Sequence, residues 1–279
     1  MPKQKVIKVQ QFDKNIPIEC YTIEDNIELF DFSYHYQYNF YQIYWFTEIC
    51  NSEHQIDFES YPIGKQQIWI IYPGQVQYFN PTGIKGYYLA IDKDYFNRII
   101  SQEIQEIKLH FTPPIWYELT ESKIPLFKAL MYLFEEEWHT HKRTSLLEKY
   151  LTIYLHHIQD LKELSTHRHP TDNRVQFLLQ QVELYYATHQ NNEFYANKVS
   201  LSVKRMNELL VNATQYTLNQ HIHNRLLLEA KRLIGYSDLT IQQIASELGF
   251  NEVNYFNRFF KKRLTLTPLE FRKKVKKVQ

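Results

Sequence analysis

The chain has 279 residues, more than one small domain needs, and a formal net charge of +1. No apolar run reaches the roughly 18 residues of a membrane span, and the first residues lack the apolar core of a secretory signal. The two cysteines, Cys20 and Cys50, are therefore expected to be free thiols in a reducing cytoplasm.

Charge is distributed unevenly along the chain. Residues 1–169 hold 16 Lys and Arg against 22 Asp and Glu, or 16 − 22 = −6, whereas residues 170–279 hold 16 against 9, or 16 − 9 = +7. This asymmetry is typical of a nucleic-acid-binding module fused to another domain, although a basic surface also serves solubility.

Short segments rich in β-branched and aromatic residues follow a weakly patterned start, 1–33, in which we expect one or two strands. Pro and Gly separate them, which favours a small antiparallel barrel or sandwich. The expected strands are 41–48, 54–63, 67–72, 76–80 and 86–91.

A barrel of this kind encloses either a small ligand or only its own side chains. The candidates for an effector pocket are Tyr41, Ile43, Trp45, Phe58, Trp69, Tyr72 and Tyr78. Core packing is the alternative role for each, because the pattern does not show which of them point inward.

Helices are expected next, over 94–107 and in two longer segments. The first of these carries an apolar stripe from Ile124 to Trp138, and the second opens on a predicted capping box, Ser145-x-x-Glu148, and carries a stripe from Leu147 to Leu161. The stripes cover either the outer surface of the barrel or the same helix of a second subunit, which would make a homodimer.

A polar segment with a proline, 163–173, indicates a linker. It divides the chain into an N-terminal domain, 1–162, and an all-helical domain, 174–279. The predicted fold class is thus α+β and multidomain.

Residues 240–263 form the strongest pattern. Thr240-x-x-Gln243 is a capping box, Ala245 allows two helices to approach closely, and Gly249 stands where a helix ends with positive φ. Asn251 is a candidate cap of the next helix, in which Phe256, Phe259 and Phe260 mark the buried side and Asn254, Asn257, Arg258 and Lys261 the outer side. The pattern predicts a helix-turn-helix, with an ordinary helical hairpin as the alternative.

A second copy precedes it. Ala196 lies 49 residues before Ala245, and Met206 lies 50 before Phe256, so the second turn is one residue longer. Two such units on a connecting helix, 219–234, are suited to successive major grooves, about 34 Å apart.

The segment 239–272 resembles the C-terminal signature of the AraC/XylS transcription regulators. The matching residues include Ile244-Ala245, Gly249-Phe250, Phe260-Lys261-Lys262 and Thr267-Pro268-x-x-Phe271-Arg272. Ser200 and Glu208 depart from the usual pattern of the first unit. The resemblance implies binding to promoter DNA, recruitment or blocking of RNA polymerase, and an N-terminal cupin-like barrel that binds a small effector or mediates dimerisation.

Two sets of residues are predicted to contact DNA. Those expected to read bases are Lys204, Arg205, Asn207, Glu208, Val253, Asn254, Asn257 and Arg258. Those expected to contact phosphates are Ser202, Arg225, Asn251, Lys261, Lys262 and Arg263. Glu208 either accepts a hydrogen bond from a cytosine or stays in water.

Chemistry in the first domain is not indicated, and we expect no metal, no cofactor and no enzyme. His35 and His54 are isolated, and the pairs His139-x-His141, His167-x-His169 and His221-x-His223 lack a complete ligand set. The alternatives are a cupin-type metalloenzyme and a protein adaptor, each with a helical accessory domain.

Overall fold

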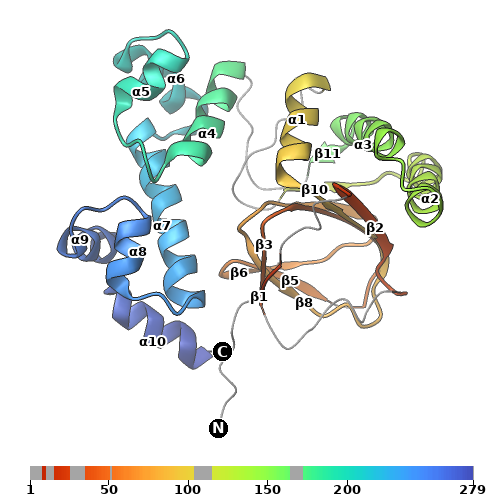
Figure 1. Cartoon of the computed structure of the whole chain (residues 1–279), viewed down its shortest axis with the longest axis horizontal. Coiled ribbons are helices and arrows are strands. Elements are labelled where there is room, and N and C mark those ends of the chain that lie inside the picture. The colour runs from red at the N-terminus through yellow and green to blue at the C-terminus, as the bar shows by residue number, and fades with distance from the viewer. Residues whose placement is uncertain are drawn as a thin grey trace. The chain divides into compact units, whose positions relative to one another are not determined.

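The computed structural model describes residues 8–10, 16–25, 35–50, 52–103, 115–163 and 172–278. The chain divides into two compact units, residues 5–166 and 167–279 (Figure 1). Most of the predicted linker, 163–173, lies outside the described residues.

The described strands of the first unit form two sheets, antiparallel except where β1 pairs with β3. The five-stranded sheet has the order β1 (Lys8–Gln10), β3 (Tyr36–Tyr38), β8 (Val76–Phe79), β5 (Glu53–Ile56) and β6 (Glu59–Pro62). The six-stranded sheet has the order β11 (Lys162–Glu163), β10 (Ile115–Glu118), β7 (Gln67–Ile71), β4 (Tyr41–Glu48), β9 (Lys85–Ile91) and β2 (Ile18–Thr22). An N-terminal antiparallel β-domain is thereby confirmed.

One predicted strand is wrong. Residues 54–63 do not run straight, because Asp57 adopts φ +57° and turns the chain into the hairpin β5–β6, with Ile56 paired to Glu59. Aspartate tolerates this left-handed conformation. The Asp57 side chain also accepts a hydrogen bond from the backbone of Val76 at 3.2 Å, which ties the turn to β8.

Three helices belong to the first unit: α1 (Lys93–Glu103), α2 (Ile124–Thr140) and α3 (Thr144–Gln159). The apolar stripes of α2 and α3 pack in one buried cluster with side chains from the six-stranded sheet, so they cover the outer face of that sheet in their own unit. The expected capping box of α3 does not form. The helix starts at Thr144 with no side-chain cap, and Glu148 instead pairs with Arg98 at 2.9 Å.

The second unit is helical throughout its described residues. It contains α4 (Asn173–Tyr185), α5 (Asn192–Lys198), α6 (Val203–Thr214), α7 (Leu218–Tyr236), α8 (Ile241–Glu247), α9 (Val253–Leu264) and α10 (Pro268–Val278). Figure 1 shows the pair α5–α6 near one end of α7 and the pair α8–α9 toward the other. At 19 residues, α7 is about 28 Å long.

Candidate nucleic-acid interface

The two helical pairs repeat each other closely. Helices α5 and α8 have 7 residues each, and α6 and α9 have 12 each. Both turns place one residue at positive φ, Ser200 at +52° and Gly249 at +77°. The next amide in each turn then bonds back to the buried alanine, Leu201 to Ala196 at 3.1 Å and Phe250 to Ala245 at 2.9 Å. This bond ends the first helix in the manner of a Schellman motif.

Gly249 is required by packing as well as by conformation. A Cβ at this position would collide with the carbonyl oxygen of Ala187, which follows α4. Ser200 has a side chain at the equivalent place, so the first turn has room that the second lacks.

The two repeats bury equivalent faces. Ala196 and Ala245 are both buried, as are Met206 and its counterpart Phe256. The predicted inner face of the second helix-turn-helix, Phe256, Phe259 and Phe260, is likewise buried. The polar sides of α6 and α9 therefore face outward.

Helix α9 presents an exposed cationic and amide surface. Asn254, Arg258, Lys261 and Lys262 are exposed, and Val253 and Asn257 are half-buried. Within the described residues, Arg258 and these two lysines have no ion-pair partner. Such groups are suited to base edges and phosphates.

Tyr255 also belongs to this surface, although the site prediction omitted it. It is 55% exposed, and its ring contacts Phe250 at 5.7 Å between centroids. Its position one residue from Asn254 on a helix already assigned to DNA contact was the available signal.

Two predicted phosphate contacts at the ends of α9 need qualification. Asn251 is exposed but does not cap the helix, because the N-cap is Glu252, without a side-chain bond. Arg263 is half-buried, lies 4.0 Å from the ring centroid of Phe259 and donates to the carbonyl oxygen of Phe259. Burial lowers the pKa of Arg263. Lys261 and Lys262 are exposed, unlike Arg263, and are therefore more accessible to a phosphate.

Helix α6 has fewer unengaged groups. Arg205 forms an ion pair with Glu208 at 3.1 Å along the same helix, so Glu208 has a partner within the protein. The hydroxyl of Ser202 caps α6 by accepting from the backbone of Arg205. Lys204 is exposed. The Asn207 amide is bound internally, with its oxygen 2.9 Å from the backbone nitrogen of Leu218.

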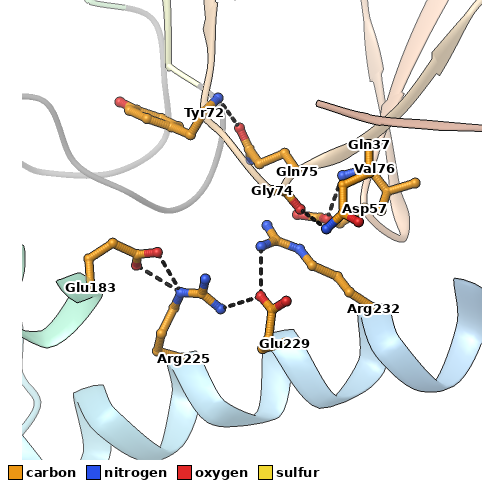
Figure 2. A network of polar contacts seen from close by, with 10 residues as sticks. All are labelled: Gln37, Asp57, Tyr72, Gly74, Gln75, Val76, Glu183, Arg225, Glu229 and Arg232. Atoms are coloured by element: carbon orange, nitrogen blue, oxygen red, sulfur yellow. Dashed lines mark hydrogen bonds and ion pairs between the residues drawn. The ribbon is translucent and has the colours of Figure 1, made fainter. Parts of the chain in front are cut away.

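Arg225 has a structural position, which corrects its predicted phosphate contact. Figure 2 shows its guanidinium between the carboxylates of Glu183 on α4 and Glu229 on α7, at 2.8 Å from each. Its side chain is 9% exposed and lies against the ring of Tyr186. Burial opposes its charge, but the two carboxylates outweigh burial and raise the pKa of Arg225. The group therefore locks α4 to α7.

The proposed effector-pocket set is mostly on the wrong face of its sheet. Tyr41, Ile43, Trp45 and Tyr72 belong to the cluster between the six-stranded sheet and the helices, not to the barrel interior. Trp69 does face the interior, whereas Phe58 and Tyr78 are half-buried outside both clusters. The error follows from strand alternation, since neighbours on β4 point to opposite faces and the apolar side of Tyr41, Ile43 and Trp45 meets the helices.

The interior instead contains a hydrogen-bonded polar cluster that sequence reasoning missed. Gln77 bonds to Gln42 and to the hydroxyl of Tyr44, and Gln42 donates to Tyr88 at 3.0 Å. His54 lies 2.8 Å from the Gln77 amide oxygen, so its Nε2 is the donor. Among the residues that the structure describes, its buried Nδ1 has no hydrogen-bond partner, and burial lowers the pKa of His54 to about 4. The signal in the sequence was a glutamine at the second position of two largely apolar strands, Gln42 in β4 and Gln77 in β8.

No group of three or more His, Cys, Asp or Glu side chains among the described residues is placed to hold a metal ion. None of the described helices has the length and apolar character needed to cross a membrane.

Comparison with known proteins identifies the second unit. Residues 195–274 match the family described as "Helix-turn-helix domain". The HTH-type transcriptional activator RhaS of Escherichia coli (strain K12 / DH10B) is 26% identical over 100 residues, which is 36% of this chain and 36% of that protein. The C-terminal unit is thus a double helix-turn-helix domain. This unit is therefore similar to part of an HTH-type transcriptional activator.

Two solved structures are also similar. The C-terminal domain of the two-component response regulator yesN from Fusobacterium nucleatum is 23% identical and covers 36% of this chain and 99% of that one, with a TM-score of 0.35. ToxT from Vibrio cholerae is 12% identical and covers 92% and 97%, with a TM-score of 0.43.

Proposed function

We propose that this protein is a sequence-specific transcription regulator of the bacterial AraC/XylS type that binds promoter DNA in the cytoplasm. Helices α6 and α9 enter successive major grooves on one face of the duplex, and the N-terminal unit senses a small effector or mediates dimerisation. The observation that supports this function best is the exposed surface of α9, where Asn254, Arg258, Lys261 and Lys262 project from a helix anchored by three buried phenylalanines.

The exposed cations on both helix-turn-helix pairs favour DNA contact at both ends of α7. Exposed Lys204 lies on α6, and Lys261 and Lys262 lie on the last turns of α9. Each cation that neutralises a phosphate releases condensed counterions, so binding should weaken steeply with salt.

Electrophoretic mobility shifts of genomic fragments, followed by footprinting, test the proposal. We expect a specific site with two protected segments separated by about one helical turn, 10–10.5 base pairs. The double variant Lys261→Ala/Lys262→Ala should reduce the salt dependence, and Lys128→Ala on α2 is a matched control. Absence of a retarded fragment in low salt would exclude the proposal and favour the adaptor.

The enzyme alternative has its own test. Family membership points to a regulator, a class that is usually not enzymatic. Elemental analysis of purified protein should find no stoichiometric transition metal, whereas one metal per chain would favour a cupin-type metalloenzyme.

Homodimerisation would have to use a surface other than the apolar stripe of α3, which is buried in its own barrel. Tyr132 and Leu133 on α2 and Ile153 on α3 are exposed apolar residues of the same unit. Sedimentation equilibrium with and without DNA measures the oligomeric state, and run-off transcription decides whether RNA polymerase is recruited or blocked.

A further inference from the structure

The two helix-turn-helix units differ in how they use an asparagine at the same position. Asn207 on α6 and Asn257 on α9 are 50 residues apart, the offset of their helices. The Asn207 oxygen accepts from the backbone N–H of Leu218, and its Nδ2 donates to the carbonyl oxygen of Val203 at 3.0 Å. Leu218 is the first residue of α7, where an N–H has no partner within the helix. Asn207 therefore fixes the start of the connecting helix.

The second helix-turn-helix cannot make the equivalent bond from Asn257. Position 268, which corresponds to Leu218, is a proline, the first residue of α10, and proline has no N–H. The capping residues of the two junctions are equivalent. Thr217 and Thr267 occupy equivalent capping positions, with Gln220 and Glu270 in the partner positions, and Gln215 and Thr265 both adopt left-handed φ. Within the described residues, the Asn257 side chain makes no hydrogen bond.

The neighbouring charges differ in the same direction. Glu208 corresponds to Arg258, and Val211 corresponds to Lys261. In the first helix-turn-helix the carboxylate of Glu208 pairs with Arg205 and opposes an approaching phosphate. The second helix-turn-helix has a cation at both equivalent positions, Arg258 and Lys261. Both the amide and the guanidinium of α9 are thus available to an incoming base pair.

We propose that the second helix-turn-helix, α8–α9, selects the DNA sequence. Asn257 is then a specificity-determining residue, because Pro268 offers its side chain no N–H to bind. The first helix-turn-helix, α5–α6, positions the protein on the duplex through Lys204 and discriminates weakly among bases. This assignment rests on the proposed DNA-binding function. Asparagine is suited to adenine N6 and N7, and arginine to guanine O6 and N7, so an A·T and a G·C pair are expected in the half-site of α9.

Substitution of each base pair of the bound site, one at a time, tests the assignment. Substitutions in one half-site should reduce affinity about tenfold or more, and those in the other should change it little. Asn257→Ala should abolish the preference at one or two base pairs of the sensitive half. Asn207→Ala should lower the melting temperature of the protein without DNA but retain the preference. Equal sensitivity of both halves, or equal destabilisation by the two alanine variants, would overturn the assignment.

Exchange of the residues at the helix starts tests the role of the proline directly. Leu218 occupies the equivalent position at the start of α7, so Pro268→Leu copies that residue and supplies an N–H for Asn257. Pro268→Leu should weaken discrimination at the same base pairs as Asn257→Ala, leave the salt dependence unchanged, and have little further effect when combined with Asn257→Ala. An unaltered base preference in Pro268→Leu would contradict the proposal. If wild-type protein binds no duplex DNA, the proposed function fails and the assignment fails with it. If it binds and both half-sites are read equally, only the assignment fails.

Discussion

The Nε atom of Arg225 lies 2.8 Å from both carboxylate oxygens of Glu183, across the interface between α4 and α7. Glu229 holds the same guanidinium from the next turn of α7 and also pairs with Arg232 at 3.2 Å (Figure 2). An arginine that the sequence predicted to contact phosphate is thereby assigned to the rigidity of the second unit rather than to its surface.

Arg225→Ala should destabilise the C-terminal unit by about 3–5 kcal/mol, because it removes the partner of the half-buried Glu183 carboxylate and one of the two arginines that pair with Glu229. Urea unfolding followed by circular dichroism measures the change. The matched control, Lys262→Ala, removes an exposed cation and should leave stability within about 0.5 kcal/mol of wild type. An Arg225→Ala protein of wild-type stability with weakened DNA binding would restore the phosphate-contact prediction.

The same network predicts a dependence on pH. Burial raises the pKa of Glu229, but Arg225 and Arg232 outweigh burial, so its folded pKa lies below the ordinary 4.5. A depressed carboxylate pKa stabilises the fold above the unfolded value, and this contribution disappears as pH falls through the folded value. Glu229→Gln should therefore unfold with a smaller loss of stability between pH 5 and pH 3 than wild type does, about the ordinary range of a carboxylate. If Glu229→Gln and wild type lose the same stability between pH 5 and pH 3, the ionisation of Glu229 does not contribute to the acid sensitivity of the fold.

Arg258→Ala should cost about 1–3 kcal/mol at the cognate site and relax specificity at the base pair that Arg258 contacts. Lys262→Ala should instead weaken binding to all sequences alike and flatten the salt dependence. Fluorescence anisotropy titrations on cognate and scrambled duplexes at several salt concentrations separate the two effects. Binding of Arg258→Ala to its operator with wild-type affinity would mean that the recognition face of α9 is misplaced.

His54 should make the barrel sensitive to acid. Its pKa is about 4 in the folded barrel against an ordinary 6.5, so the unfolded chain binds the proton more readily between these values. Stability from this group is complete above pH 6.5 and falls by about 3 kcal/mol as the pH decreases to 4. His54→Gln removes the titration and should flatten the slope. Tryptophan fluorescence reports this unit alone, since the tryptophans are Trp45, Trp69, Trp116 and Trp138. Identical slopes for wild type and variant would contradict the prediction.

Gly249→Ala should destabilise the C-terminal unit by more than about 1 kcal/mol, since alanine is disfavoured at φ +77° and its Cβ would meet the carbonyl oxygen of Ala187. Ser200→Gly, at the equivalent turn, should be neutral or slightly stabilising because it relieves a left-handed conformation. Thermal melts of the two variants make the comparison. Equal tolerance at both positions would show that Ala187 can move away.

Much of the DNA-binding unit could be predicted from sequence because its determinants are local. A capping box such as Thr240 with Gln243 involves residues three apart, and the confirmed φ > 0 at Gly249 follows from one residue type. The roles of Arg225 and Asn207 could not be predicted, because their partners Glu183 and Leu218 are 42 and 11 residues away. The prediction of which residues line the interior between the sheets was wrong for a related reason. Strand alternation shows that Tyr41 and Gln42 face opposite ways, but not which face meets the helices.

The sequence by itself determined the paired helix-turn-helix units, their turns and their outward polar faces, because helix periodicity and capping act over a few residues. Only the tertiary structure decided which polar groups remain available to a ligand. Hydrogen bonds and ion pairs between distant segments engage Arg225 and Asn207, and a proline at the start of another helix leaves Asn257 without the donor that its counterpart has.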